Sequence, residues 1–177
     1  YASKQRTDWV LDWPAQSIIA VDNIYWTKEV ARAIETGKLE EYYKTCVSQL
    51  IGLVNLVRGD LSKLARQTLS AVVTIDVHNR DVVKDLVNAK ISSSKEFDWM
   101  AQLRYYWCTK GSVIMNDTEK PNETDKCQVA IINAVLYYGF EYLGNSDRLV
   151  ITPLTDRCYR TLMGAYHLYY GGAPEGP

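Results

Sequence analysis

Apolar residues recur at intervals of three or four positions through most of the first half of the chain. After Pro14, whose ring suits a first helical turn, the recurrence continues to Gly37. The apolar positions are Ile19, Trp26, Val30, Ala33 and Ile34. Because this spacing matches the turn of an α-helix, it predicts a helix with one apolar face between the proline and the glycine.

The strongest pattern of this kind lies in residues 38–59. Its apolar positions are separated by steps of three and four, and charged and polar residues occupy the opposite face. These positions are Leu39, Tyr42 or Tyr43, Cys46, Leu50, Leu53 and Val57. One apolar face and one polar face predict an amphipathic helix with one side buried in a core.

Two more helices are predicted in the next part of the chain. Gly59 is suited to end the preceding helix and Asp60 to cap the next one, whose apolar period runs from Leu61 to Val72. A shorter helical segment, residues 79–90, follows until a run of serines interrupts the pattern. Together these segments predict a helical bundle over residues 1–97.

The pattern changes from helical to extended after this bundle. Residues 97–107, "FDWMAQLRYYW", are dense in aromatic side chains, and residues 127–138, "CQVAIINAVLYY", are rich in β-branched ones. The polar residues between them, 109–126, contain the Gly, Pro and Asn typical of an exposed loop. The sequence therefore predicts a β-hairpin at 98–138, and the expected fold class is mainly α with a small β-hairpin (α+β).

Short apolar pieces interrupted by glycines and a proline fill residues 139–154. This pattern indicates an irregular segment that lies against another body. Thr155 or Asp156 can cap a last helix. The buried stripe predicted for that helix consists of Cys158, Leu162 and Tyr166.

The charges of the chain are nearly balanced. Lys plus Arg number 20 and Asp plus Glu 21, for a net charge of -1 and a pI near 6.2. This balance supplies no broad attraction to nucleic acid or to an anionic membrane, and no apolar run is long enough to span a bilayer. The start of the chain lacks an initiator Met and the layout of a signal peptide, so we expect an excerpt from a longer protein.

The chain has four cysteines: Cys46, Cys108, Cys127 and Cys158. They form no C-x-x-C pair and match no zinc spacing. Two glycosylation sequons, at Asn116 and Asn122, lie between the second and third cysteines and imitate a disulfide-closed loop of a secreted protein. Without a signal peptide, reduced thiols in a cytosolic compartment are the favoured interpretation.

The stretch "DVHNRD" gathers groups that could carry chemistry: Asp76, His78, Arg80 and Asp81. A kinase-type loop needs contiguous His-Arg-Asp, and a metal needs more ligands than are present, so a polar network at a bend between helices is favoured. The other histidine, His167, lies in a helical stripe without a nucleophile or metal partner nearby in sequence, and packing is the default for it.

Six stretches of the chain resemble dynein heavy chains in order and spacing: "DWVLDWPAQ", "IYWTKEV", "TIDVHNRDVV", "QLRYYW", "YGFEYLGNS" and "LVITPLTDRCYRTL". The resemblance implies that residues 1–138 are the C-terminal part of the linker, with helices at 1–97, and that residues 139–177 begin the first AAA+ module, an α/β fold. The wording of "QLRYYW" and "GGAPEGP" is most similar to single-headed inner-arm dyneins of cilia and flagella. The loop at 109–126 is longer than the family leads us to expect.

The resemblance also implies a nucleotide site. Its adenine pocket would be lined by Leu149, Val150, Ile151, Pro153 and Leu154. From periodicity alone, a short buried strand without a ligand is the favoured interpretation of these residues, and the resemblance reverses that preference. Gly176 would be the first position of a Walker A phosphate loop, whose lysine would lie beyond Pro177. The cofactors would be ATP or ADP with Mg²⁺, and we expect no catalytic residue and no metal ligand within these 177 residues.

The function implied by the resemblance is a part of an ATP-driven, minus-end-directed microtubule motor that powers ciliary and flagellar beating. The implied partners are the rest of the AAA+ ring, microtubules through a distant stalk, and dynein intermediate and light chains, with no nucleic acid and no membrane. The implied location is the axoneme. Two alternatives remain at this point: a non-enzymatic helical protein-interaction module, and a different P-loop NTPase.

Overall fold

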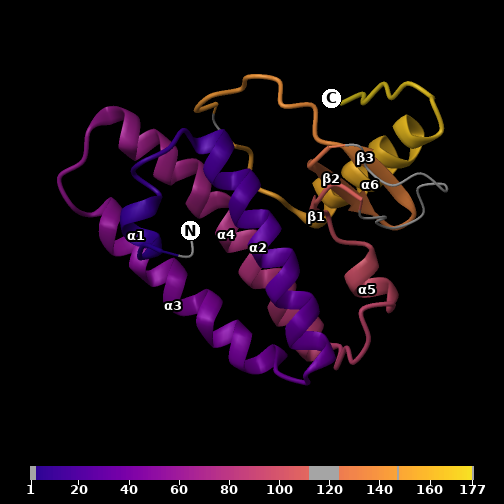
Figure 1. Ribbon diagram of the computed structural model, residues 1–177, viewed down its shortest axis with the longest axis horizontal. Coiled ribbons are helices and arrows are strands. Elements are labelled where there is room, and N and C mark those ends of the chain that lie inside the picture. Colours follow the sequence, from indigo (N-terminus) through magenta and orange to yellow (C-terminus); the bar gives the residue numbers. More distant parts are fainter. Residues whose placement is uncertain (1–2, 112–123, 147, 177) are drawn as a thin grey trace. The chain divides into compact units, whose positions relative to one another are not determined.

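The chain divides into two compact units, shown in the computed structural model of Figure 1. The first unit comprises Tyr1–Ser93 and Glu141–Ile151, and the second comprises Ser94–Phe140 and Thr152–Pro177. The structure describes residues 3–111, 124–146 and 148–176. Long helices and one small antiparallel sheet confirm the predicted fold class, mainly α with a small β region.

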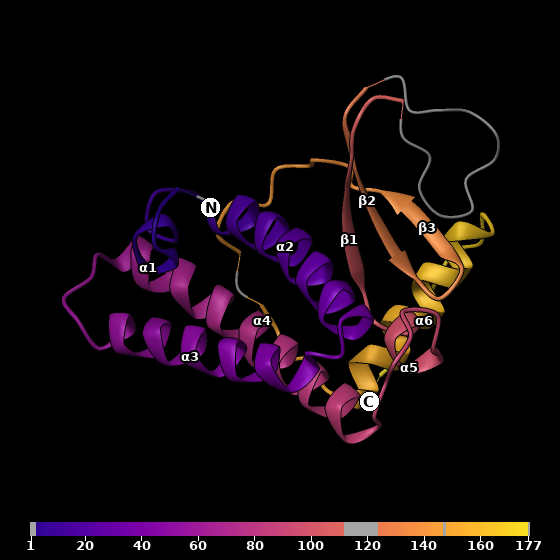
Figure 2. The same ribbon diagram turned by 60° about the horizontal axis from the view of Figure 1, so that its bottom comes forward.

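Three long helices build the first unit: α2 (Ala15–Glu35), α3 (Leu39–Val57) and α4 (Lys63–Asn88). A single turn, α1 (Arg6–Trp9), precedes them. The long helices pack against one another, and they lie side by side in Figures 1 and 2. The two amphipathic helices predicted for residues 14–59 are confirmed.

The core of this unit lies where the apolar faces of the three helices meet α1. Its largest side chains are almost completely buried, and the burial of each stabilises the folded state by on the order of 1.5 to 3 kcal/mol. The cluster comprises Trp9, Val10, Ala15, Ile18, Ile19, Leu53, Leu69, Ala71 and Val72. The apolar periodicity of the sequence is therefore explained by one shared core.

The prediction of two separate helices between residues 60 and 90 is wrong, because α4 is one continuous helix. The apolar period lapses near Asp76 and Asn79, yet both residues face the other helices and find polar partners there. A polar residue on the packed side of a helix is tolerated when its partner is also inside. The predicted polar network is present, but without a bend between helices.

The cap of α4 also differs from the prediction. Ser62, not Asp60, precedes the first turn, and its hydroxyl accepts a hydrogen bond from the Ala65 amide at 3.2 Å. A side-chain oxygen at this position satisfies one of the free amides at the start of the helix. Both residue types are good caps, so local sequence alone could not choose between them.

The second unit contains a three-stranded antiparallel sheet, where two strands were predicted. The strands are β1 (Arg104–Cys108), β2 (Lys126–Ile131) and β3 (Ala134–Tyr137), in that spatial order. Tyr105 pairs with Val129, and Ile131 pairs with Ala134. The predicted hairpin is thus confirmed as β1 and β2, and its second half splits into two strands.

Two local features explain this difference. Ile132 adopts a φ of 52°, and with Asn133 it forms the tight turn that reverses the chain between β2 and β3. The aromatic residues before β1 form a helical turn, α5 (Phe97–Met100), instead of a strand. Neither feature could be recognised in the sequence. Ile rarely adopts the left-handed conformation, and a four-residue helix is too short to show a repeating apolar pattern.

The long loop between β1 and β2 is described only at its base. There the Lys110 amide donates to the Asp125 carboxylate at 2.8 Å. The two sequons at Asn116 and Asn122 lie in residues 112–123, outside the described residues.

Helix α6 (Pro153–His167) packs against β3 and β2 in the second unit. Its cap is Thr152, and the predicted cap Thr155 is instead the third helical residue. The predicted buried stripe is wrong: Cys158 and Tyr166 are exposed and Leu162 lies at the rim of a groove. Over the described residues, no helix is long and apolar enough to cross a membrane.

Candidate functional site

The residues predicted to hold adenine form one short stretch that spans the end of the first unit and the start of α6. Leu149 and Val150 lie in an irregular segment and are 81% and 70% exposed, and Leu154 is 70% exposed. Ile151 is half-buried and Pro153 is exposed. Large apolar side chains that are this exposed indicate that something else covers them in the working protein.

The sequence builds the helix start within this stretch with several matching signals. The Thr152 hydroxyl accepts from the Thr155 amide at 3.3 Å, and the Thr155 hydroxyl accepts from the Thr152 amide at 2.7 Å. Pro153 takes the first helical position, where its missing N–H has no intrahelical role. This reciprocal capping defines where α6 begins.

The segment upstream of the apolar stretch is anchored to the start of α2. We refer to residues 141–145 as the strap. The Gln16 side-chain oxygen accepts hydrogen bonds from the amides of Leu143 at 2.7 Å and Gly144 at 3.2 Å. The Gln16 side-chain nitrogen donates to the carbonyl of Glu141. One glutamine thus holds three backbone groups of the strap.

The strap in turn caps α2. Pro14 occupies the cap position and offers no side-chain oxygen to the helix. Instead, the Asn145 oxygen accepts from the Ala15 amide at 2.6 Å, and the Gly144 carbonyl accepts from the Gln16 amide at 3.0 Å. Both amides are among those that a helix leaves unsatisfied at its start. Asn145, 130 positions from Ala15 in the sequence, therefore supplies the side chain of this cap.

In the sequence, Gly144 and Asn145 stand out only as interruptions of an apolar pattern. Two features of the sequence could have revealed the cap. A proline stands at the start of α2, where a residue with a side-chain oxygen is expected, and an asparagine follows a glycine at a place where no local helix begins. Gly144 has a φ of +58°, a conformation that suits glycine and allows the strap to turn at this point.

The predicted first position of the phosphate loop, Gly176, is exposed and lies in an irregular end that follows α6. A side chain built at Gly176 would meet no atom within 4 Å. The structure places this glycine on the surface.

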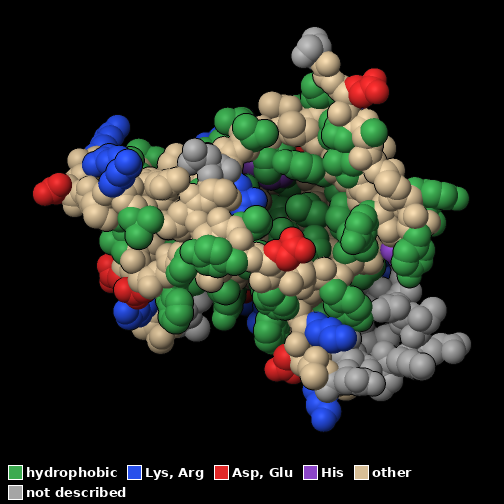
Figure 3. Space-filling model, turned by 90° about the horizontal axis from the view of Figure 1, so that it is seen from above, with side chains coloured by type: hydrophobic (Ala, Val, Ile, Leu, Met, Phe, Trp, Pro, Cys, Tyr) green, Lys and Arg blue, Asp and Glu red, His purple; other side chains and the backbone are tan. Residues whose placement is uncertain are grey.

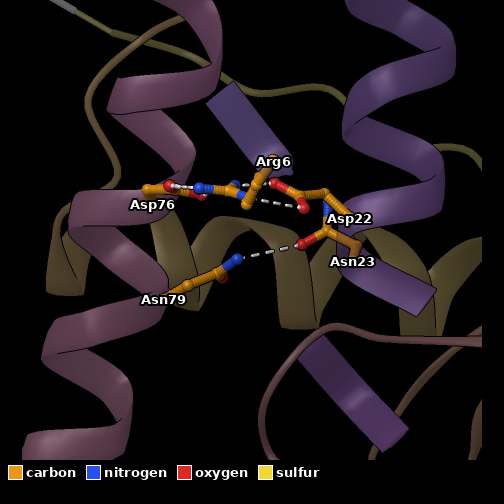
Figure 4. Close-up of polar contacts among 5 residues, drawn as sticks. All are labelled: Arg6, Asp22, Asn23, Asp76 and Asn79. Carbon is orange, nitrogen blue, oxygen red and sulfur yellow. Dashed lines mark hydrogen bonds and ion pairs between the residues drawn. The ribbon is translucent and has the colours of Figure 1, made fainter. Parts of the chain in front are cut away.

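A buried ion cluster joins α1, α2 and α4, as Figure 4 shows. Arg6 donates to both oxygens of Asp76, at 2.7 and 2.8 Å, and to both oxygens of Asp22. Beside it, the Asn79 amide donates to the Asn23 oxygen at 3.3 Å. Burial raises the pKa of Asp76 to about 6, because the lost hydration and the charge of Asp22 outweigh the attraction of Arg6.

This cluster explains part of the "DVHNRD" stretch without catalysis. Asp76 pairs with Arg6, whereas Arg80 pairs with its neighbour Asp81 at 2.7 Å. Within the described parts of the chain, no group of three or more His, Cys, Asp or Glu side chains is arranged to hold a metal ion. His167 lies near the backbone of Val135, 3.3 Å from its carbonyl, where α6 meets β3.

All four cysteines are free thiols. Burial raises the pKa of both Cys46 and Cys127 to about 11, so both thiols stay protonated near neutral pH. Cys158 on α6 is exposed.

An apolar groove of about 510 Å³ lies within the second unit, between α6 and the sheet. Aromatic side chains dominate its lining: Tyr105, Tyr137, Tyr138, Tyr159, Tyr166 and Tyr170. Apolar side chains are also widespread on the face of the molecule in Figure 3. The groove lies apart in sequence from the predicted adenine stretch and shares no lining residue with it.

Comparison with known proteins identifies the class first. Residues 138–177 match the family model of the hydrolytic ATP binding site of the dynein motor region. These residues contain the exposed apolar stretch, the start of α6 and the glycine-rich end. This part of the chain is therefore similar to the ATP-binding region of a dynein motor.

The whole chain then identifies the family. It is 50% identical over 179 residues to dynein axonemal heavy chain 12 of Homo sapiens, covering 100% of this chain and 5% of that protein. It is 50% identical over 177 residues to human dynein axonemal heavy chain 3, and 49% identical over 178 residues to dynein axonemal heavy chain 1 of Mus musculus, covering 100% of this chain and 4% of each relative. The chain belongs to the dynein heavy-chain family.

These matches favour the motor interpretation over a stand-alone interaction module. They also favour it over an unrelated P-loop NTPase, because the similarity includes residues 1–137, which precede the ATP-binding match. The chain spans only 4% to 5% of the length of these relatives.

Proposed function

We propose that the chain is the junction between the linker and the first AAA+ module of an axonemal dynein heavy chain. Residues 1–138 would be the C-terminal part of the linker, and residues 139–177 the start of the module. The observation that carries this proposal is the 50% identity over the whole chain to axonemal heavy chains, together with the ATP-binding match over 138–177.

The activity of the complete protein would be ATP-driven, minus-end-directed movement along microtubules. The axonemal relatives support a role in the axoneme. Within it, the protein would act as an inner-arm dynein that powers ciliary and flagellar beating. The sequence contains no G-x-x-x-x-G-K-[ST] motif, so these 177 residues alone would not hydrolyse ATP. Their task would be to transmit the state of the nucleotide to the linker.

Within this function, the apolar stretch would receive adenine. Leu149, Val150, Ile151, Pro153 and Leu154 would cover the faces of the base. Exposure of Leu149, Val150 and Leu154 supports this assignment, because a base-binding surface is open to water when no ligand is bound. Gly176 would open the loop that holds the phosphates, and Mg²⁺ would accompany ATP or ADP.

The partners would be those of a dynein complex. They comprise the remaining AAA+ modules of the ring, microtubules bound through the stalk, and dynein intermediate and light chains. The location would be the axoneme of a cilium or flagellum.

A charge placed in the apolar stretch tests the nucleotide site. In the full-length heavy chain, Val150→Asp and Ile151→Asp should each weaken ATP binding by about tenfold or more, because the carboxylate would lose water against the base without gaining a partner. Titration with a fluorescent ATP analogue measures the dissociation constant. Val150 is highly exposed, so its substitution should not disturb folding.

The matched control is Leu64→Asp, at an exposed apolar position in the first turn of α4. An acidic residue is favourable there, and nucleotide affinity should not change. Unchanged affinity in both stretch variants would overturn the adenine assignment.

A further inference from the structure

The strap and the first turn of α2 satisfy each other's backbone groups. The amides of Ala15 and Gln16 donate to acceptors of the strap, and the amides of Leu143 and Gly144 donate to the Gln16 side chain. All of these residues belong to the first unit. The contact therefore has two directions: the strap caps the helix, and the helix holds the strap.

This arrangement depends on two side chains. Pro14 cannot cap α2, so without Asn145 the Ala15 amide loses its acceptor. Without Gln16, the strap amides of Leu143 and Gly144 lose theirs. The remaining link, from the Gln16 amide to the Gly144 carbonyl, is a single hydrogen bond of 3.0 Å.

The strap also leads directly into the apolar stretch. Only three residues, 146–148, separate Asn145 from Leu149. A fully extended chain of this length spans little more than about 13 Å, so a displacement of the stretch beyond that slack must pull on the strap. Whether the pull reaches α2 depends on the strength of the attachment.

We propose that Gln16 and Asn145 are positioning residues that latch the strap to the start of α2, so that movement of the nucleotide-binding stretch is passed to this helix. The latch rests on the proposed function, and it assigns the transmission of the signal to two residues outside the nucleotide site. A strap detached from α2 would absorb the movement, and nucleotide turnover would no longer drive the helix.

The chemistry of Asn145 provides a matched pair of variants. Asn145→Asp keeps an oxygen for the Ala15 amide and adds a negative charge at a helix start, which is favourable. Asn145→Leu keeps the size of the side chain and removes the acceptor. The pair therefore separates loss of the hydrogen bond from change of shape. Asn55→Leu, at an exposed position on α3, controls for an added leucine.

Hydrogen exchange in the full-length heavy chain tests the latch itself. Loss of a helix cap should raise the equilibrium ratio of detached to attached strap by about fivefold. In Asn145→Leu, exchange of the Ala15, Leu143 and Gly144 amides should accelerate by about that factor. In Asn145→Asp and Asn55→Leu it should stay near the wild-type rate. Unchanged exchange in Asn145→Leu would overturn the latch.

Microtubule gliding tests the coupling. In Asn145→Leu and Gln16→Ala, gliding velocity should fall relative to ATP turnover, because nucleotide is still hydrolysed but moves α2 less. Asn145→Asp should restore the ratio, which general destabilisation of the fold would not explain. A wild-type ratio in Asn145→Leu, despite faster exchange, would overturn the role in coupling.

A separate measurement, nucleotide binding by the wild-type heavy chain, tests the proposed function independently of the latch. If the wild-type heavy chain binds no fluorescent ATP analogue, the motor assignment is overturned. The exchange measurement then still reports whether the strap is latched to α2.

Discussion

At the scale of single residues, the buried ion cluster shows how one cation organises three helices. Arg6 lies in a single-turn helix that could not form alone, and it binds carboxylates from α2 and α4. Two carboxylates share one guanidinium, so the cluster retains a negative charge inside the protein. The price of that charge is visible in the raised pKa of Asp76.

Removal of Arg6 should strongly destabilise the fold. Arg6→Met leaves Asp22 and Asp76 buried without their cation, which typically costs about 3 to 5 kcal/mol. The shift of the midpoint in urea denaturation measures this loss. Lys38→Ala removes one member of an ion pair whose side chains are both mostly exposed, and should change stability by less than about 1 kcal/mol. Equal effects of the two substitutions would contradict the assigned role of the cluster.

The charge state of Asp76 should make stability depend on pH. Its carboxyl has an ordinary pKa of 3.8, which applies to the unfolded chain, and a folded pKa of about 6. Between these values the folded state holds the additional proton, so this group's contribution to the free energy of unfolding falls as pH rises from about 4 to about 6 and is constant above that range.

Denaturation between pH 4 and pH 8 checks this dependence. Asp76→Asn should remove this part of the slope, whereas Asp85→Asn, at an exposed position on the same helix, should preserve it. Identical slopes in the wild type and Asp76→Asn would show that Asp76 does not hold this proton.

At the scale of elements, the helix starts differ in where their caps come from. The caps of α4 and α6 are local, supplied by Ser62 and Thr152, whereas the cap of α2 comes from Asn145. A local cap lets a helix begin independently, and a distant cap lets its start depend on tertiary structure. The helix that the proposed latch connects to the nucleotide-binding stretch is α2, whose cap is the distant one.

The two candidate caps of α4 can be distinguished by substitution. Ser62→Ala removes the oxygen that accepts from the Ala65 amide, and should cost about 1 kcal/mol. Asp60→Ala should cost less than about 0.5 kcal/mol, because Asp60 lies before the cap position and is exposed. Thermal unfolding of both variants provides the comparison, and a larger loss for Asp60→Ala would refute the assignment.

At the scale of the whole molecule, the chain does not complete one unit before it begins the other. The first unit takes its last residues, Glu141–Ile151, from beyond the sheet, and the second takes α6 from beyond the strap. The ATP-binding match, residues 138–177, therefore includes residues of both units. A conformational change in residues 138–177 can therefore be passed along the chain both to the helices of the first unit and to the sheet of the second.

The sequence by itself determined the long helices α2 and α3, the hairpin of β1 and β2, the fold class and the dynein family. These depend on periodic patterns and on extended similarity, which are properties of the linear chain. Tertiary structure alone decided the continuity of α4, the third strand and the cap of α2. In each case, the deciding partner is distant or rare: Arg6 for Asp76, a left-handed Ile132 for the turn, and Asn145 for Ala15. Such features become energetically favourable only once folding brings distant residues together, and the local pattern of apolar and polar residues does not predict them.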